Sequence, residues 1–191
     1  MVGVDKEERL YTGIWTAFKM RHAWLQVNLL TAFAAGFVVS LFEGTITQIV
    51  ALAAFLPILA GQSGNTGCQA LAITLRGITL GDLSSHPVRK LIAKELTLGA
   101  MNGLLTGIVA GLAMWWSAGG SGSDKSVLLG FVILLAMIGA CMASGLFGVL
   151  VPLTLRRFGA DPCTASSIFL TTGTDIASMG LMLALATVLV L

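Results

Sequence analysis

Five long apolar runs constrain this chain more than any other feature of its sequence. A helix needs about 20 mostly apolar residues to cross the hydrocarbon core of a bilayer. Runs of this kind, the second with a polar, glycine-rich interruption, cover Trp24–Phe42, Thr45–Leu75, Leu96–Trp116, Val127–Leu155 and Thr164–Leu191. Charged residues make up only 10% of the chain, against about 25% in soluble domains. We therefore expect an all-α integral membrane protein with five transmembrane helices, surrounded by the lipid bilayer.

The positions of lysine and arginine predict the orientation of these helices, because cytoplasmic loops of membrane proteins are enriched in both. Lys125 falls on one side of the predicted topology, and all the others fall on the opposite side: Lys6, Arg9, Lys19, Arg21, Arg76, Arg89, Lys90, Lys94, Arg156 and Arg157. We expect a cytoplasmic N-terminus and an external C-terminus, in a multi-pass protein of the cell membrane. The net charge of +2 and the scattered basic residues give no indication of a nucleic-acid partner.

An amphipathic segment precedes the first apolar run. Its apolar residues recur at helical spacing among charged ones, at Leu10, Tyr11, Ile14, Trp15 and Phe18. We interpret residues 1–22 as a helix at the cytoplasmic interface, which acts as a membrane-surface anchor or, alternatively, as a plug over a pore mouth. Residues 23–191 then form one five-helix transmembrane domain.

Small residues recur at four-residue intervals in two of the apolar runs. They are Gly99, Gly103, Gly107 and Gly111 in the third run, and Ala140, Ser144 and Gly148 in the fourth. Such a stripe lets two helix backbones approach closely within a membrane. We interpret these two helices as scaffold.

Asp175 is an ionisable residue inside a predicted span, which is a reason to expect function there. It lies 16 residues before the C-terminus, or about 24 Å along a helix. A helical projection places five hydroxyl side chains within roughly 100° of it, namely Thr164, Ser167, Thr171, Thr174 and Ser178. The predicted spans contain no lysine or arginine that would pair with the carboxylate. The alternative is a carboxylate satisfied by neighbouring helices, with the hydroxyls bonded to their own backbone.

A second polar segment, PILAGQSGNTGCQ, runs from Pro57 to Gln69. Its glycines are expected to loosen the helix, and its amides, Gln62, Asn65 and Gln69, lie near one face. Polar or irregular backbone at membrane depth is tolerated where it lines a watery cavity or is buried in protein. A pore lining and hydrogen-bonded helix contacts fit this spacing equally well.

An unpaired carboxylate among hydroxyls suits a hard divalent cation such as Mg²⁺ or Ca²⁺ better than Zn²⁺ or Cu⁺. Because Mg²⁺ keeps several waters and touches one or two carboxylates, one Asp175 from each of two subunits would be enough. Two such carboxylates close together would repel each other and share a proton when no cation is bound, which predicts pH-sensitive uptake. Glu43 is a candidate vestibule charge, although an acid near a helix N-terminus is favourable in itself, and we favour that interpretation. Asp161 and Pro162 are typical of a helix start.

The segments PILAGQSGNTGCQALAITLRGITLGDL and FGADPCTASSIFLTTGTDIASMG resemble the transmembrane domain of the MgtE magnesium transporter family, and the similarity extends from Arg21 onward. The resemblance implies a homodimer with a pore between the second and fifth helices of both subunits, in which Asp175 and backbone carbonyls near Thr171 hold a largely hydrated Mg²⁺. It also implies that the N-terminal helix is a plug, and that the lining includes Gly61, Gly64, Asn65, Gln69, Ser167, Thr172, Thr174 and Ser178. Mn²⁺, Co²⁺ and Ca²⁺ share these oxygen ligands.

This chain departs from the family pattern in two ways. Ser63 stands where many members have glycine, and the large cytosolic sensing region of the family is absent from the sequence. Two interpretations stay open: a natural minimal pore, for which a separate cytosolic regulator is a candidate partner, or the membrane part of a longer protein. Three alternatives to a channel are a Na⁺-coupled exchanger, a structural membrane subunit and a membrane enzyme. The exchanger lacks a convincing inverted repeat, and the enzyme lacks a second catalytic group at the depth of Asp175, so we do not expect an enzyme.

Overall fold

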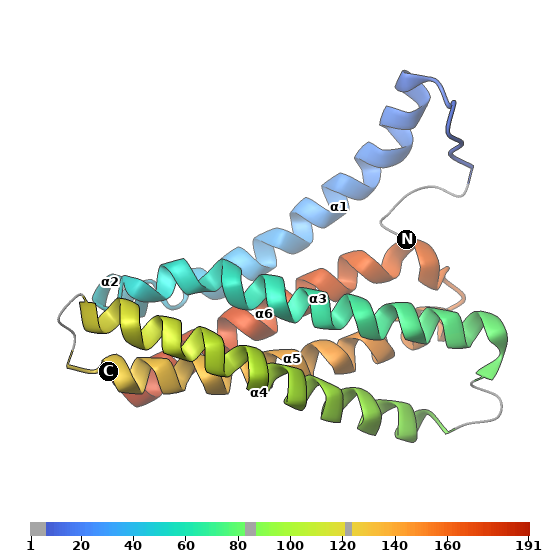
Figure 1. Cartoon of the computed structure of the whole chain (residues 1–191). Helices are drawn as coiled ribbons and strands as arrows, with labels where there is room; N and C mark the ends of the chain where they lie inside the picture. Colours follow the sequence, from blue (N-terminus) through green and yellow to red (C-terminus); the bar gives the residue numbers. More distant parts are fainter. Residues whose placement is uncertain (1–6, 83–86, 121–123) are drawn as a thin grey trace.

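The computed structural model describes residues 7–82, 87–120 and 124–191, and within these ranges every regular element is a helix (Figure 1). The helices are α1 (Ile14–Ser40), α2 (Glu43–Gln48), α3 (Ala51–Leu80), α4 (Val88–Gly120), α5 (Ser126–Arg157) and α6 (Pro162–Val190). Lys6, used above to predict orientation, lies outside the described residues, as does the start of the predicted N-terminal helix.

Among the described residues, four helices are long and apolar enough to cross a membrane: α1, α4, α5 and the Ala165–Val190 part of α6. The chain is therefore a multi-pass membrane protein. At 30 residues α3 is long enough as well, but its amides and Arg76 make it too polar to be counted with the other four. The fifth span predicted from the sequence is thus present as a long helix, and its passage through the membrane remains a prediction.

Helix α1 begins at Ile14, within the segment 1–22 that was predicted as a separate helix, and continues through the boundary predicted at residues 22 and 23. From Ile14 to Ala35 the sequence contains neither proline nor glycine, so nothing breaks the helix between the aromatic residues and the apolar run. Leu10 and Tyr11 precede the helix. Separate helices on the two sides of that boundary are therefore wrong. The N-terminal half of α1 leans away from the other helices, while its C-terminal half packs on α6 (Figure 1).

The glycine-rich segment does not interrupt α3, which runs unbroken through Pro57, Gly61, Gly64 and Gly67. Inside a bilayer an unpaired backbone group costs several kcal/mol, which outweighs the roughly 1 kcal/mol that glycine costs a helix. The break lies instead at Ile49 and Val50, between α2 and α3. Thr45 therefore belongs to α2, not to the second span.

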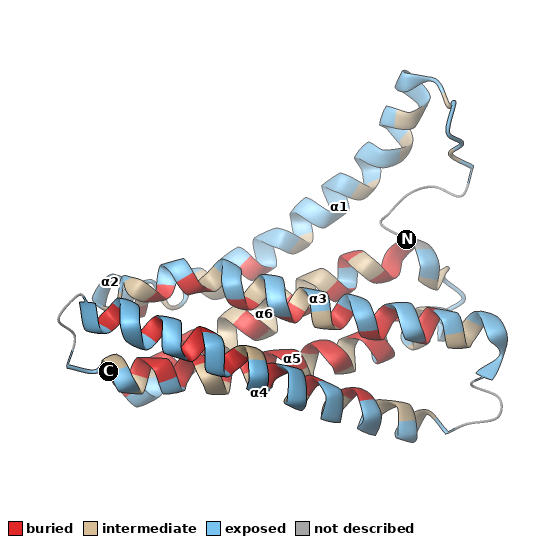
Figure 2. Cartoon of the chain, viewed as in Figure 1, coloured by how far each residue is buried: buried red, intermediate tan, exposed pale blue. Residues whose placement is uncertain are grey.

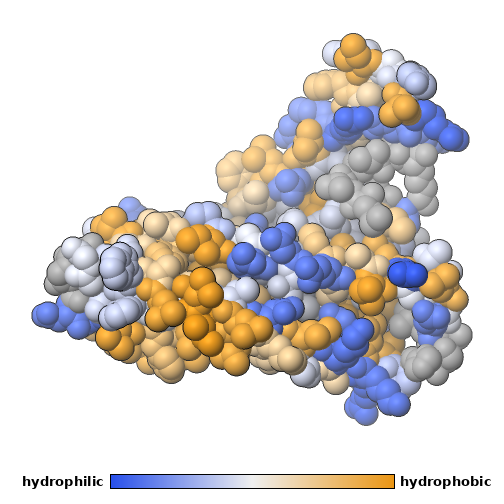
Figure 3. Space-filling model, in the orientation of Figure 1, coloured by the Kyte–Doolittle hydropathy of each residue, from blue (hydrophilic) through white to orange (hydrophobic). Residues whose placement is uncertain are grey.

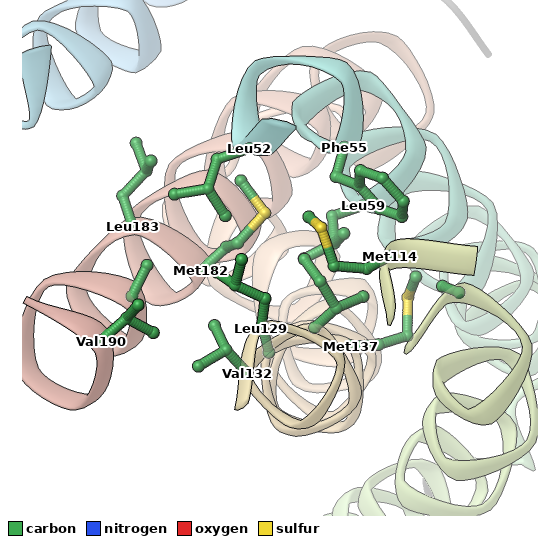
Figure 4. Close-up of a cluster of buried hydrophobic side chains, with 14 of the residues drawn as sticks. Leu52, Phe55, Leu59, Met114, Leu129, Val132, Met137, Met182, Leu183 and Val190 are labelled. Carbon is green, nitrogen blue, oxygen red and sulfur yellow. The ribbon is translucent and has the colours of Figure 1, made fainter. Parts of the chain in front are cut away.

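The core of the bundle lies around α5, which packs on α3, α4 and α6 and has buried residues along its length (Figure 2). Leucine, methionine and branched side chains from four helices meet there (Figure 4), among them Leu52, Leu59, Met114, Val132, Met137 and Met182. The outer faces of the helices carry large exposed apolar residues, as expected for a surface in contact with lipid.

The predicted small-residue stripes are confirmed as packing surfaces. A Cβ atom added at Gly99 would lie 2.6 Å from the carbonyl oxygen of Cys141, and one added at Gly103 would lie 2.7 Å from the Cα of Ile138. On its other side α5 meets α3, where a Cβ at Gly148 would lie 2.7 Å from the carbonyl oxygen of Gly67. Both contacts join backbone to backbone, so a side chain at these positions would push the helices apart.

Candidate functional site

Asp175 lies near the middle of α6, 13 residues after its first residue and 15 before its last. The start of this helix is fixed as predicted: Asp161 is the N-cap, its carboxylate accepts a hydrogen bond from the Cys163 backbone N–H at 3.2 Å, and Pro162 follows. The side chain of Asp175 is half-buried. Within the described residues, no lysine or arginine forms an ion pair with it. A carboxylate at mid-membrane depth therefore reaches the surface of the protomer.

The hydroxyl residues of α6 divide into two sets. Thr171 and Thr172 are half-buried and follow the same partly exposed side as Asp175. Thr174 and Ser178, in contrast, have no exposed surface, and the methyl group of Thr174 lies 3.2 Å from the Cβ position of Gly67 on α3. Both therefore point into the protomer, and their predicted place in a pore lining is wrong for this packing. Of the Thr164 side chain nothing is described.

Most of these hydroxyls bond to the backbone of their own helix. Thr171 and Thr172 donate to the Ile168 carbonyl at 3.1 and 2.9 Å, and Thr174 donates to the Thr171 carbonyl at 2.9 Å. Since a hydroxyl that donates keeps its oxygen lone pairs, Thr171 and Thr172 can still accept from a hydrated ion. The Ser167 hydroxyl is buried and has no hydrogen-bond partner among the described residues.

The candidate residues of α3 lie on its surface. Gly61, Asn65 and Gln69 are exposed and Gly64 is half-buried. A Cβ at Gly61 or Gly64 would meet no atom within 4 Å, whereas one at Gly67 would lie 3.0 Å from Leu170 of α6. Packing within the protomer thus explains why residue 67 is a glycine, but it does not explain the glycines at Gly61 and Gly64. Since α3 packs on α6 through Gly67, the outer surfaces of these two helices adjoin each other.

Glu43 is the first residue of α2 and is exposed. This is the position that favours an acid at a helix start. Helix α2 is held to α6 by a hydrogen bond of 2.7 Å between the hydroxyls of Thr45 and Thr187. Because Thr187 lies twelve residues beyond Asp175, or about 18 Å along the helix, α2 lies well away from the level of Asp175.

The start of α1 is held together by contacts among its own residues. Its aromatic rings stack on one another, Trp15 on Phe18 and Phe18 on His22, with the Lys19 ammonium over the Trp15 ring. Arg21 pairs with Glu8, which precedes the helix. In this arrangement the segment stands away from α3 and α6 (Figure 1), and the choice between anchor and plug remains a prediction.

No group of three or more His, Cys, Asp or Glu side chains comes together in the parts of the chain that the structure describes. A divalent cation at Asp175 would therefore take its remaining ligands from water, from hydroxyl and carbonyl oxygens, or from a second copy of the chain.

Glu95 is a buried carboxylate that the sequence analysis did not single out. Only 7% of the residue is exposed, and the Cβ position of Gly145 on α5 lies 2.8 Å from its carbonyl oxygen. Its carboxylate lies 3.8 Å from the ammonium group of Lys94. The sequence contained one indication of this burial: Glu95 lies four residues before Gly99, and therefore on the same helix face as the glycine stripe.

Comparison with known proteins decides the family. The MgtE family, described as divalent cation transporters, matches residues 56–185, which is more than half of the chain. The chain belongs to the MgtE family. It is similar to the magnesium transporters MgtE of Bacillus subtilis (31% identity over 180 residues) and Enterococcus faecalis (31% over 181), covering 92% and 94% of this chain and 38% of each relative. The MgtE of Thermus thermophilus is 29% identical over 192 residues, or 97% of this chain and 40% of that protein.

The chain thus spans about two fifths of the length of the curated MgtE relatives that it matches. The matched region contains α4 and α5 completely, α3 from residue 56 onward, and α6 as far as residue 185. Asp175 and the α3 glycines all lie within it.

Proposed function

We propose that two copies of this chain form a pore that carries Mg²⁺ across the membrane, lined by the outer surfaces of α3 and α6 and centred on Asp175. The observation that carries this proposal is the half-buried carboxylate at the middle of α6, which has no cationic partner among the described residues. Such a charge facing lipid is costly. A cation in a water-filled path between two protomers would relieve that cost.

The number of ligands also favours a dimer. Each protomer supplies one carboxylate at this depth, and Mg²⁺ keeps several waters while it touches one or two carboxylates. Two Asp175 side chains across a two-fold axis would provide both. The hydroxyls of Thr171 and Thr172 would accept hydrogen bonds from the waters of the ion. The Thr171 carbonyl already accepts the Thr174 hydroxyl, so we expect it to bind the ion through water.

On α3, the open space beside Gly61 and Gly64 fits a wide path for a hydrated ion. Asn65 and Gln69 would contribute amide oxygens to that path. The names of the relatives support Mg²⁺ as the cargo, and hard oxygen ligands do not by themselves separate it from Mn²⁺, Co²⁺ or Ca²⁺. Glu43 remains a candidate for gathering cations at the outer mouth.

The test is Mg²⁺ entry into liposomes that hold the purified chain and a trapped indicator, under an imposed membrane potential. Wild type is compared with Asp175→Asn, which removes the charge and keeps the shape, and with Asp124→Asn, the same change at an exposed position before α5. We expect uptake that grows with a negative interior, is lost in Asp175→Asn and persists in Asp124→Asn.

Equal uptake by wild type and Asp175→Asn would refute the role of Asp175. Uptake that appears only with a Na⁺ gradient would replace the channel with a coupled exchanger.

A further inference from the structure

A crevice between α3 and α4 is not used by the proposed pathway. Helix α3 packs closely on α5 and α6 and only loosely on α4. The end of α3 and the start of α4 border an open crevice of about 310 Å³. Two basic residues and one acidic residue lie among its lining, which consists of Ile73, Thr74, Gly77, Asp82, Pro87, Lys90, Leu91 and Lys94. Figure 3 shows hydrophilic residues gathered at the end of the molecule where α4 begins.

The two lysines stand one above the other at the start of α4. Lys90 and Lys94 are four residues apart and therefore share one face of α4. They lie two and six residues after Val88, or about 3 and 9 Å along the helix. Both are exposed, and both fall on the side of the membrane where nearly all the other basic residues are predicted.

Asp82, just after α3, also lines the crevice, and the remaining lining residues are mainly apolar. Ile73 is exposed on the α3 side, and Leu98, one turn beyond Lys94, continues the same face of α4 as an exposed residue. The outer end of the crevice thus has two lysines against one aspartate, and apolar side chains lie further along the two helices. Because the crevice opens between two helices of a membrane protein, lipids have access to it.

We propose that this crevice binds an anionic phospholipid, with the phosphate between Lys90 and Lys94 and the first part of an acyl chain against Ile73 and Leu98. Basic pockets between transmembrane helices are typical sites for anionic headgroups. A soluble phosphate would gain nothing from the apolar part of the crevice, so the geometry favours a lipid. This proposal does not depend on what the chain transports.

Glu95 supplies a second, opposite test. Its carboxylate lies 3.8 Å from the Lys94 ammonium, so it competes with a lipid phosphate for the same cation. Glu95→Gln keeps the shape of the buried side chain and removes this competition. The variant should therefore bind anionic lipid more tightly than wild type.

The experiment is native mass spectrometry of the full chain in detergent, titrated with dioctanoyl phosphatidylglycerol and, separately, with dioctanoyl phosphatidylcholine and inorganic phosphate. Wild type should prefer phosphatidylglycerol. The double variant Lys90→Gln/Lys94→Gln should lose about tenfold or more in affinity for it, since each basic residue near the surface contributes to anionic lipid binding. The matched control, Arg156→Gln/Arg157→Gln, removes two neighbouring charges at the end of α5 and should leave the affinity unchanged.

Three results would overturn the proposal. Equal binding of the two lipids would remove the headgroup preference, and equal losses in the lysine and arginine variants would indicate general surface attraction. Competition by inorganic phosphate at the concentrations at which the lipid binds would identify a free anion site instead. Circular dichroism of each variant establishes that it is folded, and Glu95→Gln, with its expected gain, keeps the test decisive if the lysine variant unfolds.

Discussion

Replacing Gly99 by alanine tests the helix packing that positions the whole bundle. The added Cβ would lie 2.6 Å from the Cys141 carbonyl oxygen and 2.9 Å from both the Cys141 carbonyl carbon and the Met142 Cα. Favourable contacts between such atoms require about 3.5 Å, so α4 and α5 must separate by close to 1 Å. All three atoms belong to backbone, and no side chain can move aside to make room. Overpacking of this kind costs about 1–3 kcal/mol.

Gly36→Ala is the matched control, because a Cβ at Gly36 of α1 would meet no atom within 4 Å. Both changes add the same methyl group inside a helix and gain the same helix propensity, so the difference between them isolates the packing strain. We expect Gly99→Ala to be less stable than Gly36→Ala by about 1–3 kcal/mol. The assay is unfolding in mixed micelles of rising SDS content, followed by circular dichroism. Equal unfolding midpoints for the two variants would refute the close α4–α5 contact.

Three further changes follow from the same structure. Asp161→Ala removes the N-cap of α6 and should cost about 1 kcal/mol of stability in the same unfolding assay, whereas Asp161→Asn should cost little. Thr45→Val breaks the hydrogen bond to Thr187 and should lower the free energy of unfolding by about 0.5–1.5 kcal/mol. Thr187→Val should cost less stability in the Thr45→Val background than in wild type. Fully additive costs of the two changes would contradict the contact. Gly64→Leu fills space that is open in the protomer, so it should reduce Mg²⁺ flux in liposomes without lowering the unfolding midpoint, and unchanged flux would remove Gly64 from the lining.

The helices that pack by a local pattern could be predicted from the sequence alone. The fourth predicted run, Val127–Leu155, differs from α5 by one and two residues at its ends. The glycine stripe of α4 indicated its contact with α5, because four-residue spacing is a property of one helix and does not depend on its neighbour's identity. The start of α6 could also be predicted from the sequence, because capping by Asp161 involves only adjacent residues.

Features that depend on neighbouring helices could not be read in the same way. The projection around Asp175 grouped all nearby hydroxyls, but the position of α3 against α6 decides that Thr174 and Ser178 point inward. Glu95 was not singled out because it follows Lys94 at the edge of a predicted span, where charged residues are common. Only the packing of α4 on Gly145 of α5 shows that Glu95 is buried. The unbroken course of α3 reflects the cost of unpaired backbone in a membrane, which local propensity does not include.

Access of water to position 175 tests the central claim most directly. Cysteine is placed at Asp175, or at the exposed, lipid-facing Leu105 of α4 as a control, in a chain whose Cys68, Cys141 and Cys163 are replaced by alanine. Liposomes are then treated with a charged, water-soluble thiol reagent, and labelling is followed by mass spectrometry. A water-filled path centred on residue 175 predicts rapid labelling there and none at 105. Equally slow labelling at both positions would show that residue 175 faces lipid or protein, and would contradict a cation pathway through this site.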